Sequence, residues 1–157
     1  MDVKHTYLFQ PGLWTVDGRY LDREENPHTQ TGELVIVHAR DLWTIDSQLN
    51  ISGQDPRKLE SRYEVTPFAN DKSYTDWKSD TDGPEPVYGL FVVVQDAIMM
   101  PWQSRSGIYW GQEVLAKVSD HEYISRGFAF IKDDKVASWA ARLSRIDSGE
   151  ASSLTVN

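Results

Sequence analysis

Short runs of alternating apolar and polar residues follow one another along almost the whole chain, and helical periodicity is nearly absent. Alternation with a period of two is typical of strands that bury one face. The turns between the runs are mostly short and polar, as in antiparallel hairpins. The runs that we expect to form strands cover residues 11–22, 33–51, 59–68, 74–78, 87–100, 106–118, 121–131 and 135–146.

These runs predict an all-β fold in which consecutive strands pair in an up-and-down antiparallel meander of about eight to ten strands. Closing such a sheet into a β-barrel removes its exposed edges, so a barrel is favoured, with a β-sandwich as the alternative. Residues 33–51 are long enough for one strand or two, and residues 23–32 are expected to form a loop. The run 87–100 is apolar on both faces, like a strand buried on both sides, and residues 137–145 could also form a helix.

The length of 157 residues suits a single domain. We assign residues 1–146 to the barrel and expect residues 147–157, which are small and polar, to form a flexible C-terminal tail. There are no cysteines, which excludes disulfides, thiolate catalysis and cysteine-based zinc sites. His5, His28 and His121 are too scattered to suggest a metal site, and no motif suggests a cofactor. His38 could serve in acid–base chemistry or ligate a haem, but the alternation places it on the outer face.

The chain is acidic, with a formal net charge of −8. Nucleic-acid-binding proteins usually carry a basic face, so we expect no nucleic-acid partner. Anionic membrane surfaces are disfavoured for the same reason, and no apolar stretch approaches the length that spans a membrane. The N-terminal residues lack the apolar run of a secretory signal, and we therefore expect a cytoplasmic protein.

The alternation also predicts which side chains point into the barrel. On the first strand Trp14 and Tyr20 share the inward face, and on the last strand Trp139 and Arg145 share it. On the strands between them, the residues that we expect to point inward include Val35, Val37, Leu59, Tyr63, Ile108, Trp110, Gln112, Arg126 and Phe128. With an even number of strands, Trp14 and Arg145 meet at one barrel end, where a guanidinium stacked on an indole contributes about 0.5–2 kcal/mol. We interpret this pair as a structural plug and expect the ligand-binding end to be the opposite one.

The predicted interior is mostly aromatic, with few polar groups, which is typical of a small-molecule site. Arg126 is the sharpest candidate, because a buried cation would bind an anionic group of a ligand. The alternatives are a register error that places Arg126 outside, or an internal ion pair with Glu113 or Asp96. The tyrosines could donate hydrogen bonds and the tryptophans could stack on an aromatic ligand, or these rings could simply fill the core. The candidate ligand-binding residues are Arg126, Tyr20, Tyr63, Gln112, Trp43, Trp110 and Trp139.

The sequence Gly12-Leu13-Trp14 on the first strand and Arg145 on the last resemble the calycin superfamily, which includes lipocalins and fatty-acid-binding proteins. Thr75-Asp76-Trp77 is similar to the lipocalin Thr-Asp-Tyr motif. The resemblance implies a lipocalin-like barrel of eight to ten strands that binds a hydrophobic ligand inside. It covers the strand pattern of nearly the whole chain, but the disulfide, the secretory signal and the carboxylate-binding Arg-x-Tyr of those families are absent.

Three functions remain open at this point. The leading hypothesis is a binding protein for a small, largely apolar molecule that could be aromatic or carboxylated. The alternative is a cofactor-independent isomerase, cyclase or lyase, in which Arg126 stabilises an oxyanion and Tyr20 or Tyr63 is the general acid. A third possibility is an oligomerisation module with a solid core, and the apolar residues 99–102 are candidates for a pocket lip or a homodimer contact.

Overall fold

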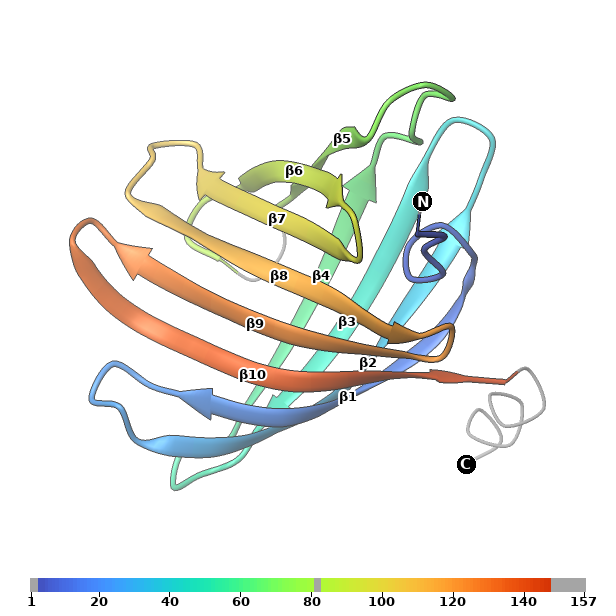
Figure 1. Ribbon diagram of the computed structural model, residues 1–157. Coiled ribbons are helices and arrows are strands. Elements are labelled where there is room, and N and C mark those ends of the chain that lie inside the picture. Colours follow the sequence, from blue (N-terminus) through green and yellow to red (C-terminus); the bar gives the residue numbers. More distant parts are fainter. Residues whose placement is uncertain (1–2, 81–82, 148–157) are drawn as a thin grey trace.

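Ten antiparallel strands close into a barrel in the computed structural model, which describes residues 3–80 and 83–147 (Figure 1). Each strand pairs with its neighbours along the chain, and the first also pairs with the last. The all-β meander and its closure are therefore confirmed. The strands are β1 (Gly12–Leu21), β2 (Pro27–His38), β3 (Trp43–Ile51), β4 (Arg57–Val65), β5 (Tyr74–Ser79), β6 (Val87–Val94), β7 (Ala97–Ser104), β8 (Tyr109–Ser119), β9 (Glu122–Ile131) and β10 (Asp134–Ile146).

Several local predictions need correction. Residues 27–32 belong to β2 instead of a loop, because they form ladder pairs with β1 on one side and, from Gln30 onward, with β3 on the other. The run 87–100 forms two strands, β6 and β7, which turn back at Gln95 with a positive φ of 56°. Residues 137–145 form part of β10, so the helix alternative is wrong. The expected tail lies outside the described residues, apart from Asp147.

The barrel is closed by the ladder between β1 and β10, in which Trp14 faces Arg145 across the strands, as predicted. The expected stacking of the guanidinium on the indole does not occur. Instead, Arg145 donates a hydrogen bond to the side-chain oxygen of Gln10 and another, of 3.2 Å, to the carbonyl of Pro11. The fully buried indole of Trp14 stacks on Tyr7, with 5.4 Å between ring centroids. The pair thus anchors the N-terminal segment against the closed end.

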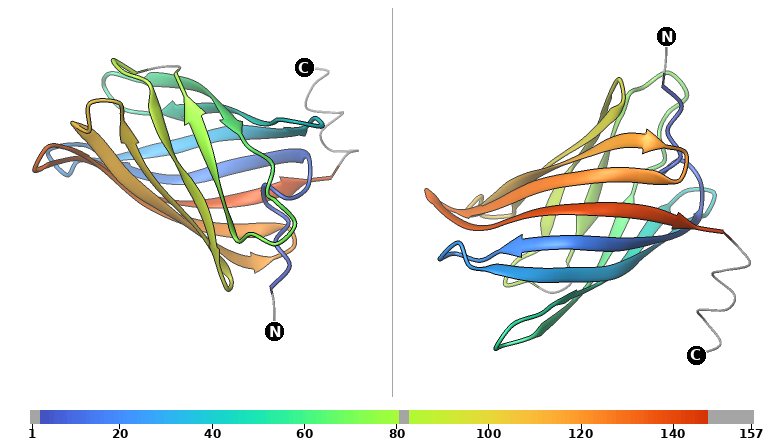
Figure 2. Two further views of the ribbon diagram at one scale, coloured as in Figure 1. Left: turned by 90° about the horizontal axis from the view of Figure 1, so that it is seen from above. Right: turned by 60° about the horizontal axis from the view of Figure 1, so that its bottom comes forward.

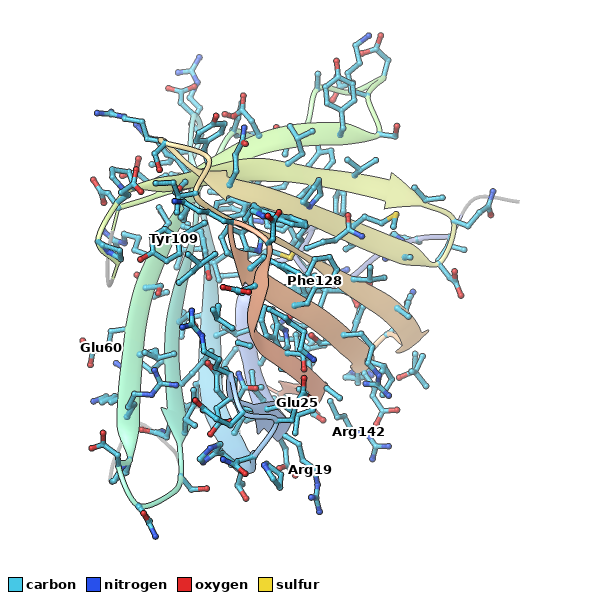
Figure 3. The ribbon with its side chains drawn as sticks, turned by 90° about the vertical axis from the view of Figure 1, so that its left-hand side faces the viewer. Arg19, Glu25, Glu60, Tyr109, Phe128 and Arg142 are labelled. Atoms are coloured by element: carbon cyan, nitrogen blue, oxygen red, sulfur yellow. The ribbon has the colours of Figure 1, made fainter. Side chains whose placement is uncertain are left out.

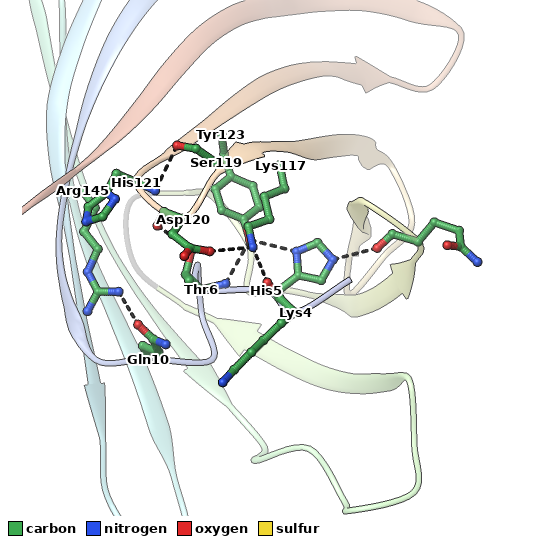
Figure 4. Close-up of polar contacts among 11 residues, drawn as sticks. Lys4, His5, Thr6, Gln10, Lys117, Ser119, Asp120, His121, Tyr123 and Arg145 are labelled. Carbon is green, nitrogen blue, oxygen red and sulfur yellow. Dashed lines mark hydrogen bonds and ion pairs between the residues drawn. The ribbon is translucent and has the colours of Figure 1, made fainter. Parts of the chain in front are cut away.

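The N-terminal segment seals this end of the barrel through Tyr123 of β9 (Figure 4). The Tyr123 hydroxyl is fully buried, accepts the backbone N–H of Thr6 at 3.1 Å and lies 2.8 Å from His5 Nδ1. His5 Nε2 lies 2.9 Å from the carbonyl of Gln95, which can only accept. Nε2 therefore carries the proton in the neutral ring, and Nδ1 accepts the hydroxyl proton of Tyr123.

The faces of the strands follow the predicted alternation on β1, β4 and β10, but β2 is reversed. Leu34 and Ile36 are buried, whereas Val35 and Val37 are 39% and 49% exposed. Both faces of this strand carry apolar residues, so composition does not decide which one turns inward. On β8 and β9, too, the apolar residues do not show which face turns inward, and this affects the assignment of the residues that line the interior.

The opposite end of the barrel is open. The ladder between β4 and β5 has only two residue pairs, so the first half of β4 has no ladder partner on that side. In Figures 1 and 2, β2–β4 cross β6–β10 steeply and the two groups of strands spread apart away from the N-terminus. Within the described residues there is no helix long and apolar enough to cross a membrane.

Replacing Tyr123 by Phe should lower the free energy of unfolding by about 1–3 kcal/mol, because the buried Thr6 N–H and the His5 ring nitrogen lose their partner. Urea unfolding followed by tryptophan fluorescence measures the change. Tyr74→Phe is the matched control, since Tyr74 is 53% exposed and its loss should stay within about 0.5 kcal/mol. Equal unfolding midpoints for the two variants would contradict the assigned role of Tyr123.

Candidate functional site

The interior of the barrel holds a cavity of about 220 Å³. Cavities of about 150 Å³ lined by aliphatic and aromatic groups hold a benzene molecule, so this one suits a ligand of one or two rings. The presence of the cavity argues against the solid-core module. The apolar lining residues are Tyr7, Val16, Leu34, Ile45, Leu49, Ile51, Leu59, Met100, Leu115, Ala141 and Leu143.

A single carboxyl group, Glu113 of β8, lines this cavity among the described residues. Its Oε2 accepts a hydrogen bond from the Ser125 hydroxyl and another, of 3.0 Å, from the indole Nε1 of Trp139. Burial raises the pKa of Glu113, and these two hydrogen bonds oppose the rise because they favour the ionised form. A carboxyl group with a raised pKa keeps its proton to a higher pH than an exposed glutamate does.

The register of three neighbouring strands creates this arrangement. Glu113 pairs with Gly127 across β8 and β9, and Gly127 pairs with Trp139 across β9 and β10. Gly127 leaves room for the indole, since an added Cβ would lie 2.3 Å from its ring carbons. The indole of Trp139 therefore lies over Gly127 and brings its N–H to the carboxylate on the far side.

Two tyrosines face Glu113 from other parts of the barrel. Burial, together with the negative charge of Glu113, raises the pKa of Tyr63 on β4 to about 12. The same two causes raise the pKa of Tyr7 in the N-terminal segment well above its usual value, with smaller contributions from the neighbouring tyrosines. Both hydroxyls keep their protons through the physiological range and serve as neutral hydrogen-bonding groups.

One further polar group of the lining has no partner. Gln30 of β2 is 6% exposed, and its side-chain oxygen makes no hydrogen bond within the described residues. Buried polar atoms almost always have partners, and an exception marks a place where a ligand or water could bind. Gln30 was not among the predicted site residues, because residues 23–32 were expected to form a loop.

Three of the predicted site residues line the cavity: Tyr20, Tyr63 and Trp139. Tyr20 contacts Arg57, whose Nη2 donates to the Tyr20 hydroxyl at 3.3 Å and whose guanidinium carbon lies 5.6 Å from the ring centroid. The roles of these three residues in ligand binding remain predictions. Trp43 does not line the cavity and instead stacks on the His38 ring, with 3.9 Å between ring centroids.

Arg126 faces outward, and the prediction that it points into the barrel is wrong. Its side chain is exposed and Nη1 donates to the backbone carbonyl of Ser125 at 2.8 Å. The inward face of β9 carries Tyr123, Ser125 and Gly127, whereas the larger apolar residues lie on the outer face. The more apolar face of β9 is not the inward one, because the indole of Trp139 fills the interior space above Gly127 and no large side chain of β9 is needed there.

Trp110 and Gln112 also face outward, against the prediction, because the inward face of β8 carries Glu113 and Leu115. They line a groove of about 1070 Å³ that crosses the outer faces of β4–β9. Figure 3 looks towards the open end of the barrel and shows the charged side chains of Arg19, Glu60 and Arg142 pointing away from its wall.

The outer groove is larger than the cavity, but several of its polar groups already bind one another. Lys78 lies 3.6 Å from a carboxylate oxygen of Glu64, and Gln103 donates to the hydroxyl of Tyr88 at 2.8 Å. The interior cavity instead contains a buried carboxyl group and an orphaned amide oxygen. We therefore take the cavity as the candidate functional site.

The sequence interpretation noted Glu113 only as a possible partner of Arg126. Two features of the sequence indicate that Glu113 points inward. It is the one acidic residue between Gly111 and Ala116, and it lies on the same face of the strand as Gly111 and Leu115. Ser125 and Gln30 carried no comparable signal, because polar residues of these types are common at the surface.

No protein-family model matches the chain, and no curated protein matches it. A solved structure titled "Structure of EF1p2_mFAP2b bound to DFHBI" is similar, with a TM-score of 0.50 and 15% sequence identity. The match covers 90% of this chain and 98% of that chain. At this level of identity the likeness concerns the fold alone.

Replacing Glu113 by Gln should stabilise the protein at about pH 8, because it removes a buried charge and keeps an acceptor for Ser125 and Trp139. The pKa of Glu113 is raised above the usual 4.5, so the folded state binds more protons than the unfolded state above that pH. The stability of the native chain therefore falls as pH rises through this window, whereas that of the variant does not.

Thermal unfolding at several pH values should show a midpoint a few degrees higher for Glu113→Gln at about pH 8, where roughly 2–4 °C corresponds to 1 kcal/mol. The advantage should disappear below the usual pKa of 4.5. Glu33→Gln, at an exposed position of β2, is the matched control and should change little at any pH. A constant difference between Glu113→Gln and the native chain across the pH range would refute the assignment.

Proposed function

We propose that this protein binds a small, largely apolar ligand of one or two rings inside its barrel. The observation that carries the proposal is the interior cavity of about 220 Å³, whose lining is aliphatic and aromatic with a few polar groups. Such a combination is typical of small-molecule sites, in which apolar walls supply affinity and the polar groups set orientation. Trp139, Tyr63 and Tyr20 would contact the ring of the ligand.

Two resemblances support the proposal. The barrel named above was solved with DFHBI bound, as its title states, and similar folds often reuse the same cavity, although fold alone does not determine function. The position of Trp14 opposite Arg145 fits the resemblance to calycins, and we propose a distant relation to that superfamily. The cytoplasmic location and the homodimer remain predictions from the sequence.

The ligand charge needs revision. A carboxylated ligand was expected because Arg126 was placed inside the barrel, and Arg126 is exposed on the outer face. Glu113 is the charged group among the described lining residues, and it would repel a carboxylate. The expectation of an aromatic ligand is still supported, because aromatic rings line the cavity.

A cofactor-independent isomerase, cyclase or lyase is the second candidate. Arg126 no longer supports it, because an exposed side chain cannot stabilise an oxyanion in the cavity. Glu113 does support it, since burial raises its pKa towards the range of a general acid or base. Tyr63 faces the same carboxylate and would supply a neutral hydroxyl donor.

Titration with ethylbenzene or naphthalene should change the tryptophan fluorescence of the protein, because Trp139 lines the cavity. Ser61→Leu should weaken binding at least tenfold, since the larger side chain would occupy the space of the ligand. Ser138→Leu is the matched control, because residue 138 alternates with the inward-facing Trp139 and lies on the outer face. Equal affinities in the two variants would count against the cavity as the binding site.

A further inference from the structure

The carboxylate of Glu113 is only half satisfied. Both of its hydrogen bonds, from Ser125 and from Trp139, reach Oε2, and within the described residues Oε1 receives none. The described lining of the cavity includes no lysine, arginine or histidine. A buried carboxylate without a positive partner is costly, and the usual remedy is an ion pair with hydrogen bonds.

A second acceptor opens into the same cavity from another strand. The side-chain oxygen of Gln30 on β2 has no hydrogen-bond partner among the described residues, and Gln30 is 6% exposed. The cavity therefore offers an anionic acceptor and a neutral acceptor that both lack donors. A complementary ligand brings several N–H donors and a positive charge.

We infer that the ligand carries a primary ammonium group attached to a ring or short apolar chain, and that Glu113 Oε1 binds this group. This inference rests on the proposed function, since it specifies the ligand of the same cavity. One ammonium N–H pairs with Glu113, and the apolar part packs against Trp139 and Tyr63. The other N–H donors are available to the rest of the lining, which includes the oxygen of Gln30. An ammonium group has three donors and no acceptor, which matches a cavity whose lining includes two acceptor oxygens without donors among the described residues.

The acid–base chemistry of the cavity gives the inference a distinct pH dependence. The titratable groups that face Glu113 are Tyr7 from the N-terminal segment and Tyr63 from β4, and Tyr20 of β1 lines the same cavity. The raised pKa values of Tyr7 and Tyr63 keep both hydroxyls neutral near physiological pH. Burial raises the pKa of Glu113, and amine affinity rises with pH as Glu113 loses its proton. The affinity falls again when the amine itself deprotonates.

The test compares four ligands of similar size at about pH 8: benzylamine, benzyl alcohol, ethylbenzene and phenylacetate. Isothermal titration calorimetry should give benzylamine an affinity at least tenfold higher than ethylbenzene, with phenylacetate the weakest. In Glu113→Gln the affinities of benzylamine and ethylbenzene should converge, whereas Glu33→Gln should preserve the difference. Gln30→Leu should reduce the benzylamine preference by a smaller factor.

The outcomes separate the inference from the function on which it rests. If ethylbenzene binds as tightly as benzylamine to the native chain, the ammonium assignment is overturned while the proposed function stands. If Glu113→Gln keeps the amine preference, another group recognises the ammonium and the role of Glu113 is overturned. If none of the four compounds binds, the proposed function fails and the inference fails with it.

Discussion

The ladder between β1 and β10 is the interaction on which the rest of the molecule depends. Without it the meander would be an open sheet with two unpaired edges, and no enclosed interior would exist. The ladder also fixes where the N-terminal segment lies, because it holds Trp14 and Arg145 against residues that precede the first strand. The same ladder therefore closes the barrel and holds the segment that seals one end, whereas β4 and β5 share only two residue pairs.

The lining of the interior has two parts: apolar side chains that stabilise the barrel, and polar groups around Glu113 that lack some of their hydrogen-bond partners. Most of the lining is apolar, as in a barrel whose core fills its own space. Around Glu113 the chain contains a half-buried carboxylate and an amide oxygen without a partner among the described residues, both of which cost stability. Natural proteins accept such costs mainly at functional sites, where binding compensates for them.

The sequence was sufficient to predict the strand order, the antiparallel meander and the pairing of the first strand with the last, because these follow from alternation and short turns. It also gave the correct faces of β1, β4 and β10, where one face is clearly more apolar than the other. It failed on β8 and β9, because these strands carry aromatic residues on the outside and small or polar residues such as Ser125 inside. The site around Glu113 depends on the register of three strands, and register over such distances is not encoded in any local pattern.

Three interior glycines each lie beneath an indole from an adjacent strand, and an added Cβ would meet the ring at 2.9 Å or less. The pairs are Gly89 with Trp77, Gly111 with Trp102, and Gly127 with Trp139. Each indole requires the missing side chain below it, and each glycine requires the ring to cover the exposed backbone. At Gly89 and Gly111 the carbonyl oxygens of Pro101 and Phe128 lie within 2.3 Å of the added Cβ and exclude a side chain whatever the indole does. At Gly127 the three nearest atoms all belong to the Trp139 indole, so these two residues change only together, and a distant relative should reveal itself by a paired substitution there even where overall identity has been lost.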